Sequence, residues 1–570
     1  MSDLDDVSRE RLMEWTRAIA RWTRLSGTAE ERAAADRVAA ELTAIGCDTR
    51  VIVHDAYISL PGPASLGVVS RPGAPASSEP LALPCITHSM GIATPAEGVT
   101  AALVDAGAGR PEDHARAGTA GKFALVEGRA TPQKAVDATR ASATGVVFAS
   151  GRIAHEMCCS PVWGSPGEST AGELPRVVLL SVDRNAGERL RALCRAGDVV
   201  VRATASVETR WRPTPIVHAD LAAGHVGAER TFVMLSGHLD SWYLGAMDNA
   251  SSNAAMLEVT RLMAARRDQL RRGLRVMFWS GHSHGRYSSS AWYADTEFVE
   301  LDERCVAHVN ADCLGAIGAD WFGTNAMPET AALAIEATRR VAGTEIDAHR
   351  VGRNSDQSFF GIGIPTILGS VSRQEDGALG WWWHTPEDTV DKIDPERLER
   401  DTRIFVEVAS RLLTEPVLPL DYVASAVDVR ANLEELASAA GDRFDLRAPI
   451  EEARRLEGAC RGLADAIRAP GLAPEDARRV NACLRELGRT LIPATYTAAG
   501  RHGHDPALDV PFLPKLQPVR RLAALDADAA HRLVVDLVRA RSEITSALRR
   551  ATTAVEVCLA HGEASGLREP

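Results

Sequence analysis

The sequence lacks several features that would each define a class of protein. Its ten cysteines include no C-x-x-C pair, and scattered cysteines in a chain of 570 residues indicate buried thiols of a reducing compartment, not a disulfide framework. No apolar run approaches the roughly 20 residues that span a bilayer. The polar, acidic first residues have neither the basic nor the apolar segment of a signal peptide. We therefore expect a cytoplasmic protein that does not contact a membrane.

Positive charge is also scarce. The 64 Lys and Arg residues are outnumbered by 76 Asp and Glu residues, which gives a formal net charge of −12. An acidic balance favours solubility and argues against a nucleic-acid or anionic-membrane surface. The partner that we expect is therefore a small-molecule or peptide substrate. At about 100–200 residues per domain, the length predicts three or four domains.

The pattern of apolar residues changes along the chain. Residues 8–45 have helical periodicity and are followed by a strand-like segment at 48–53. Short β-rich runs separated by Gly/Pro turns fill residues 60–210. Apolar strands and amphipathic helices alternate over 215–415, and the chain is almost entirely helical beyond 420. This order indicates an α/β domain with an insertion, followed by a helical domain.

Polar residues of metal-ligand type follow the strands of the α/β segment. His238 comes directly after an apolar strand, Asp248 lies at the mouth of a helix, and Asp312 and His384 lie in later strand–helix connections. Chemistry in α/β folds lies beyond the carboxyl ends of the strands. Two imidazoles and two carboxylates there make a site for zinc, manganese or iron. Asp240 is placed to orient the other ring nitrogen of His238.

The segments around these residues resemble the zinc aminopeptidase superfamily with co-catalytic metals, which includes aminopeptidase Y and glutamate carboxypeptidase II. The insertion resembles a protease-associated (PA) domain, and the tail resembles the dimerisation domain of the glutamate carboxypeptidase and transferrin-receptor branch. The resemblance covers nearly the whole chain. It rests on Gly237-His-Leu-Asp, Gly245-Ala-Met-Asp-Asn-Ala-Ser, Asn310-Ala-Asp-Cys-Leu-Gly, Ser355-Asp-Gln-Ser-Phe and His384-Thr-Pro-Glu-Asp-Thr.

The resemblance implies an architecture. It implies a phosphorylase/hydrolase-like mixed sheet flanked by helices over residues 1–60 and 212–418, and a β-rich PA-like domain over 61–211. Residues 419–570 would form a C-terminal helical bundle that joins two copies of the chain into a homodimer.

The resemblance also implies a ligand set. His238, Asp248 and Asp312 would hold one metal ion, and Asp248 with His384 would contribute to a second. Asp240 would be the carboxylate behind His238. We therefore expect one or two divalent ions, zinc in the first place, with manganese or iron as alternatives.

The pattern departs from the family at one position pair. After the strand at 274–279 the family places two consecutive glutamates, a general base and a metal ligand. Counted to the shared Gly285, these positions are His282 and Ser283. A neutral serine is a poor ligand. In an extended segment His282 and His284 would point the same way, and either imidazole could bind metal or transfer a proton near neutral pH.

Three hypotheses follow. The site is rebuilt with His282 or His284 as a ligand, or one metal remains while His282 transfers protons, or the chain is a catalytically inactive binding or assembly protein. A conventional aminopeptidase or carboxypeptidase is a further alternative. Because the ligand-type residues are present and two histidines are added, we expect a metallohydrolase that cleaves an amide-type C–N bond.

Other residues are candidates for substrate binding. Arg286 and Tyr287 could bind a substrate carboxylate or stabilise an oxyanion, although Arg286 could equally pair with a surface acid. Arg353 lies in a segment that faces the substrate in the family. Trp383, directly before His384, could form a wall of the pocket.

Overall fold

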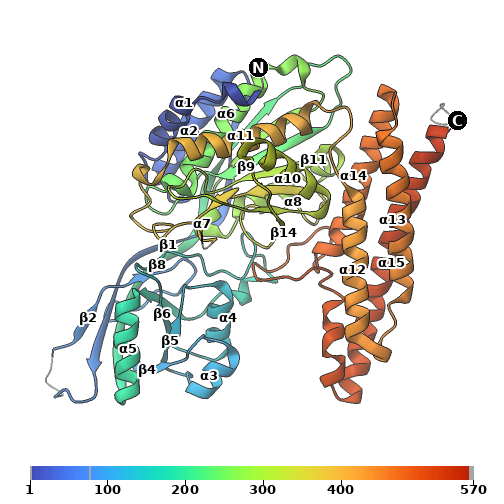
Figure 1. The fold of residues 1–570 in the computed structure, drawn as a ribbon. Coiled ribbons are helices and arrows are strands. Elements are labelled where there is room, and N and C mark those ends of the chain that lie inside the picture. The colour runs from blue at the N-terminus through green and yellow to red at the C-terminus, as the bar shows by residue number, and fades with distance from the viewer. Residues whose placement is uncertain (1–2, 76–78, 376, 564–570) are drawn as a thin grey trace.

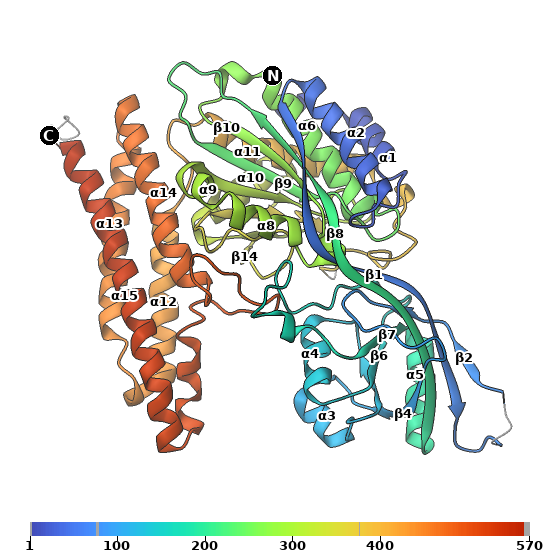
Figure 2. The same ribbon diagram turned by 180° about the vertical axis from the view of Figure 1, so that it is seen from behind.

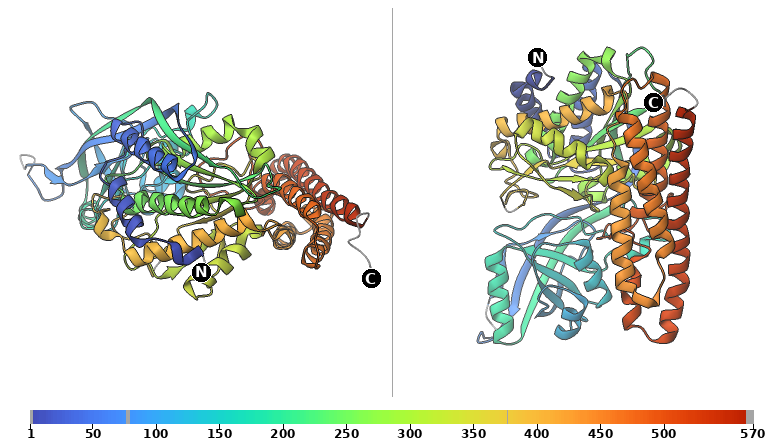
Figure 3. Two further views of the ribbon diagram at one scale, coloured as in Figure 1. Left: turned by 90° about the horizontal axis from the view of Figure 1, so that it is seen from above. Right: turned by 45° about the vertical axis from the view of Figure 1, so that its right-hand side comes forward.

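The computed structural model describes residues 3–75, 79–375 and 377–563, with side chains from 4 to 560. The ends of the predicted domain ranges, residues 1–2 and 564–570, lie outside the described part. The chain forms an α/β body, an inserted unit below it and a separate set of long helices (Figure 1). Figure 3 shows these helices running along both the body and the inserted unit.

A mixed sheet forms the centre of the α/β body. Its inner strands β9, β10, β11 and β15 are parallel, and β8 pairs antiparallel with β10. Alternate residues of β9 enter different cores: Val233 and Leu235 pack on one face, and Phe232 and Met234 on the other. A sheet covered on both faces is typical of parallel α/β folds. The strands are β8 (Val199–Leu221), β9 (Phe232–His238), β10 (Gly273–Trp279), β11 (Cys305–Ala311), β13 (Thr324–Ala326), β14 (Ala348–Arg350) and β15 (Thr366–Gly369).

Helices cover both faces of this sheet. The first core cluster lies under one group of helices, which also pack against one another, and the second cluster lies under α8 and α9. The first group is α1 (Arg9–Ile19), α2 (Ala29–Ile45), α6 (Ser252–Ala265), α10 (Pro328–Ala342) and α11 (Pro395–Thr414); the others are α8 (Ser288–Thr296) and α9 (Phe298–Arg304).

The helical pattern at 8–45 is interrupted in the structure. Ser8 caps α1 and Thr28 caps α2, and between the helices the chain leaves helical geometry. Arg24 in this break is fully buried and donates to the carbonyls of Leu239 and Gly245. The prediction of continuous helix over 8–45 was therefore wrong, and the break supports the segment that follows β9.

Two long strands connect the α/β body to the inserted unit. β1 (Asp48–Ser70) pairs with β8 along almost its whole length, from the main sheet into the unit (Figure 2). The segment expected to be β-rich also contains helices, which its Gly/Pro pattern did not indicate. The unit comprises β2 (Leu81–Leu83), β3 (Ile86–Thr87), β4 (Val99–Asp105), β5 (Phe123–Glu127), β6 (Gly145–Ala149) and β7 (Val178–Val182), with α3 (Pro111–Ala117), α4 (Pro132–Arg140) and α5 (Arg184–Ala196).

The C-terminal region is a helical bundle. Arg489 of α14 is buried and donates to the carbonyls of Leu301, Cys305 and Gly363, which fixes the bundle to the body. The fold thus confirms the predicted mixed sheet flanked by helices with a helical C-terminal region. Among the described residues, no helix combines the length and apolarity needed to cross a bilayer. The bundle comprises α12 (Tyr422–Ala440), α13 (Arg447–Arg468), α14 (Pro474–Tyr496) and α15 (Ala527–Glu563).

Candidate metal centre and its pocket

The structure brings together the four predicted metal ligands. His238 ends β9, Asp312 follows β11, Asp248 lies in the turn before α6, and His384 lies in the loop before α11. The Nε2 atom of His238 is 2.8 Å from Oδ1 of Asp248 and 3.5 Å from Oδ1 of Asp312. The Nε2 atom of His384 is 2.9 Å from Oδ2 of Asp248. The carboxylate of Asp248 therefore lies between two imidazoles.

The polar atoms of this cluster suit a bound cation. Nε2 of His238 and Oδ1 of Asp248 are buried and, although close, neither has a partner in hydrogen-bond geometry. Unpartnered buried polar atoms are costly, and imidazole nitrogen with carboxylate oxygen is the donor set of zinc, manganese and iron. The residues present therefore fit a divalent metal ion.

A buried carboxylate positions Asp248. Asp388 accepts hydrogen bonds from the backbone N–H groups of Met247 (2.8 Å) and Asp248 (3.1 Å). Burial raises the pKa of Asp388 to about 7. The turn that carries Asp248 is thus tied to the loop that carries His384, because Asp388 lies four residues beyond that histidine.

Asp240 differs in detail from the expected role. Nδ1 of His238 lies 2.8 Å from the backbone carbonyl of Asp240, whereas the carboxylate is 3.7 Å away. The carboxylate accepts instead from Ser26 Oγ (2.7 Å), the Ser283 N–H (2.9 Å) and the His282 N–H (3.3 Å). Asp240 therefore orients His238 through its backbone, and its side chain fixes the segment after β10.

The two added histidines point in different directions. Residues 282–285 form one helical turn, α7 (His282–Gly285), and not an extended segment. Residues two apart on a helix lie about 200° apart. His282 lines the cavity, while His284 is fully buried with Nδ1 3.0 Å from Ser26 Oγ and its ring against Trp242. The expectation that both imidazoles point the same way was wrong, and His284 does not line the cavity but packs behind Trp242, which does.

His282 has a buried acid behind it. Its Nδ1 lies 2.8 Å from Oδ2 of Asp356, whose other oxygen accepts from Ser290 Oγ at 2.8 Å. Asp356 is fully buried. Sequence reasoning left its role open, although the Ser355-Asp-Gln segment was a signal. The acid fixes the orientation of the ring and leaves Nε2 towards the cavity.

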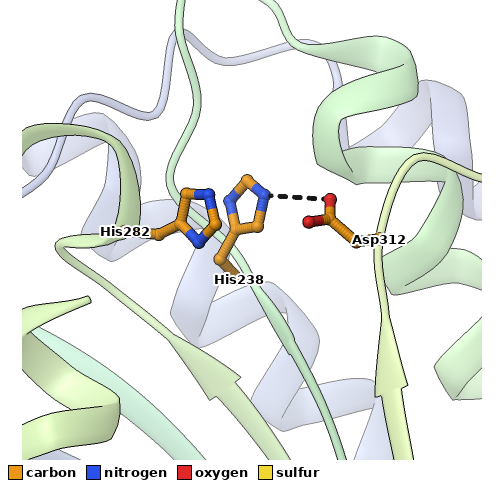
Figure 4. A group of neighbouring side chains, drawn as sticks. All are labelled: His238, His282 and Asp312. Carbon is orange, nitrogen blue, oxygen red and sulfur yellow. Dashed lines mark ion pairs between the residues drawn. The ribbon is translucent and has the colours of Figure 1, made fainter. Parts of the chain in front are cut away.

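The ring of His282 stacks on that of His238. The centroids are 3.7 Å apart and the planes differ by 10° (Figure 4). One ligand atom each of His238, His282 and Asp312 lies within 4.8 Å of the others. Nitrogen lone pairs lie in the ring plane, so two parallel rings do not direct them at one point. In this arrangement His282 is therefore poorly oriented to share an ion with His238.

Position 283, where the family has a metal-binding glutamate, carries an uncharged serine in this chain. Ser283 lines the cavity, and its Oγ is buried without a hydrogen-bond partner.

Sequence reasoning also missed Cys313, whose Sγ is 3.4 Å from Oδ1 of Asp312. Burial and the nearby carboxylates raise the pKa of Cys313, so the neutral thiol donates to Asp312. Its only sequence signal was its adjacency to Asp312.

A cavity of about 470 Å³ opens beside these residues. The α/β body, the inserted unit and the loop between α14 and α15 all contribute to its wall. The inserted unit contributes Thr131, Pro132, Gln133, Met157 and Cys158, and the loop contributes Ala507, Leu508 and Asp509.

The predicted substrate-binding residues all line this cavity. The ring of Tyr287 meets that of His282 edge-on with centroids 5.0 Å apart, and Trp383 stacks on His384 at 3.5 Å. Arg353 donates to the buried carboxylate of Asp505, so its charge is balanced within the protein.

The inserted unit also contacts His384, one of the predicted metal ligands. Nδ1 of His384 lies 2.6 Å from the carbonyl of Glu156, and the Glu156 N–H donates to the His384 carbonyl at 2.9 Å. Tyr243 donates its hydroxyl to Oε1 of Glu156 at 3.1 Å. Burial raises the pKa of Glu156 to about 8. The insertion thereby fixes the tautomer that leaves Nε2 of His384 to face Asp248.

The fold and the site together describe a mixed α/β protein with a candidate metal centre at the carboxyl ends of its strands. Residues 217–409 match peptidase family M28. The matched segment covers about a third of the chain and contains all four predicted metal ligands. The match agrees with the resemblance to the zinc aminopeptidase superfamily that the sequence motifs predicted.

Curated relatives that match part of the chain are glutamate carboxypeptidase homologues. The chain is 26% identical over 235 residues to a probable glutamate carboxypeptidase, VP8, of Zea mays, covering 36% of this chain and 32% of that protein. It is 30% identical over 140 residues to a glutamate carboxypeptidase 2 homolog of Caenorhabditis briggsae, covering 23% and 17%. The matches thus span a third or less of these relatives.

Two solved structures share the fold. An aminopeptidase from Aneurinibacillus sp. strain AM-1 has a TM-score of 0.56 at 21% identity, over 73% of this chain and 98% of that one. A peptidase M28 precursor from Shewanella amazonensis SB2B has a TM-score of 0.58 at 21% identity, over 73% and 95%.

Proposed function

We propose that this chain is a metal-dependent hydrolase that cleaves an amide-type C–N bond in a small molecule or peptide. A divalent ion, zinc in the first place, is held by His238, Asp248 and Asp312. His282 replaces the family's glutamate base. The observation that carries the proposal is the contact between His282 and the buried Asp356 at the edge of the metal cluster.

The residues supply a proton acceptor beside a metal site. A bound divalent ion lowers the pKa of water towards ~7 and polarises a carbonyl. Asp356 is placed to accept the Nδ1 proton of His282, and the neutral ring then presents Nε2 to the cavity as an acceptor. A carboxylate that fixes a histidine tautomer is the arrangement found behind histidine bases in hydrolases. His282 then takes a proton from the attacking nucleophile and Asp356 stabilises the resulting charge.

One ion is favoured over two. The second site retains Asp248 and His384, but Ser283 offers no charge where the family has a carboxylate ligand. The parallel rings of His238 and His282 argue against a rebuilt site in which both bind one ion. His384 then serves to hold the carboxylate of Asp248 in place.

Metal content and hydrolysis measured on the same samples test the proposal. The substrates are aminoacyl, N-acyl-amino-acid and cyclic amides. We expect one ion per chain and turnover in the wild type, loss of both in His238→Ala, and retention of the ion with turnover reduced about 10²- to 10⁴-fold in His282→Gln. Loss of the ion in His282→Gln would make His282 a ligand. A metal-loaded wild type that hydrolyses none of these substrates would favour a binding protein.

We further propose that residues 419–570 join two chains into a homodimer and that residues 61–211 form a PA-type domain. Helix α15 supports dimerisation because it exposes Val535 (51%) and Val538 (39%), and residues three apart on a helix lie on one face that a partner helix could cover. The ten free thiols fit a cytoplasmic location. The mass of the protein in solution tests the homodimer.

A further inference from the structure

We propose that Arg286 binds a carboxylate group of the substrate. The substrates of this hydrolase are then carboxylic acids, such as N-acyl amino acids or peptides cleaved near their carboxyl end. The inference rests on the proposed function for the reaction, but carboxylate binding can be measured without turnover.

The guanidinium of Arg286 has few partners. One of its nitrogens donates to the Ala507 carbonyl at 3.3 Å, and its carbon lies 4.9 Å from the centre of the Tyr287 ring. Its Nε is buried and has no hydrogen-bond partner. Among the described residues, no carboxylate forms an ion pair with it, in contrast to the surface acid considered from the sequence. An arginine with five donors thus leaves most of its hydrogen-bonding capacity unused beside the cavity.

Of the two other arginines that line the cavity, one is paired with an acid and, among the residues that the structure describes, the other is not. Arg353 lines the same cavity, but the buried Asp505 balances its charge. Arg373 also lines the cavity with an unpartnered Nε, and within the described parts of the chain it has no ion pair either. Two guanidinium groups therefore add positive charge to the pocket.

The acidic residues in and around the pocket either already have partners or lie at its edge. Asp248 and Asp312 belong to the metal cluster. Asp356 is bonded to His282 and Ser290, and it does not line the cavity. Asp509 is exposed on the loop. A substrate ammonium group would therefore find little compensating charge, whereas a planar carboxylate matches the fork of an arginine.

The position of Arg286 places this group near the proposed base. Arg286 follows α7 directly, and its neighbour Tyr287 contacts the ring of His282. The backbone at Arg286 is fixed because its carbonyl accepts from the Gly164 N–H at 2.7 Å. A carboxylate bound to Arg286 and the bond to be cleaved therefore occupy the same cavity of about 470 Å³, a volume suited to a small molecule.

Matched acids and amides test the inference. N-acetyl amino acids and the corresponding N-acetyl amino acid amides are titrated calorimetrically into zinc-loaded wild type, Arg286→Gln, Arg286→Lys and His238→Ala. We expect the acids to bind about 10- to 100-fold more tightly than the amides, as for hydrogen bonds to charged groups. Arg286→Gln should lose this preference, Arg286→Lys should keep part of it, and His238→Ala should keep it without the ion.

The His238→Ala protein shows whether the arginine or the metal ion binds the carboxylate. A preference for acids that persists in Arg286→Gln and disappears in His238→Ala would show that the ion binds the carboxylate, and this would overturn the inference. Equal binding of acids and amides by the wild type would also overturn it. Should Arg286→Gln fail to fold, the weakened preference in Arg286→Lys decides. Arginine-dependent binding without any hydrolysis would refute the proposed function alone.

Discussion

Restoring a carboxylate at position 283 should create a second metal site. Oδ2 of Asp248 and Nε2 of His384 are already 2.9 Å apart, and Ser283 lines the same cavity. A glutamate at this position would extend its carboxylate towards the cavity that Ser283 lines. We therefore expect Ser283→Glu to bind two zinc ions per chain where the wild type binds one.

The size of the effect follows from the number of ligands. Four-ligand zinc sites in small proteins bind with about 10–16 kcal/mol at pH 7, or about 2.5–4 kcal/mol per ligand. One added ligand then tightens the second site by a factor of roughly 70 to 900. This gain is large enough to change the occupancy of that site from mostly empty to mostly filled at a single free zinc concentration.

Elemental analysis after dialysis against chelator-buffered zinc measures this occupancy. Ser283→Gln is the matched control, because it has the same length without the charge and should still bind one ion. Two ions in the wild type would refute the argument that Ser283 weakens the second site. A single ion in Ser283→Glu, as in Ser283→Gln, would show that Asp248 and His384 are not arranged to bind a second ion.

Three further perturbations test the surroundings of the site. Asp356→Asn should lower kcat about 10- to 100-fold with zinc content unchanged, because a hydrogen bond to a charged group contributes about 1.5–3 kcal/mol; unchanged kcat would remove the acid from the mechanism. Tyr243→Phe leaves the buried Glu156 without its hydroxyl partner, and it should lower the free energy of unfolding by about 1–3 kcal/mol in urea titrations, whereas an unchanged midpoint would contradict the contact. Burial raises the pKa of Glu329, which accepts from Ser425, to about 7. The neutral acid therefore favours folding below pH ~4.5, and this advantage is lost as pH rises through 7, by up to about 3 kcal/mol. Glu329→Gln should lack this dependence in unfolding measured at pH 5 and 8, and equal pH profiles would refute the assignment.

Two of the candidate ligands, His238 and Asp312, could be predicted because each follows a strand that is apolar in sequence. His238 and Asp312 end parallel neighbours, so their convergence follows from the topology of the sheet. The contact between His384 and Glu156 had no such signal, since the two residues are 228 positions apart and meet through a backbone carbonyl. No residue pattern specifies a contact of that kind.

The periodicity of apolar residues also could not predict the conformation of the segment after β10. Gly281, Arg286 and Tyr287 all have positive φ values, of 64°, 50° and 69°. Non-glycine residues rarely adopt this region, so surrounding structure must impose it. The break between α1 and α2, by contrast, had a visible signal: Thr28 and Glu31 have the spacing of a helix-capping pair, which the apolar periodicity of 8–45 obscured.

Because different parts of the chain form the cavity wall, residues that contact the substrate can change in evolution independently of the metal cluster. The metal cluster belongs to the α/β body, whereas Met157 and Ala507 come from an insertion and from a loop between bundle helices. If the proposed function holds, substitutions in those two segments can alter substrate choice without changing the proposed metal ligands. Chimeras that exchange residues 131–133 or 507–509 with those of relatives should therefore change substrate specificity while the metal content stays the same.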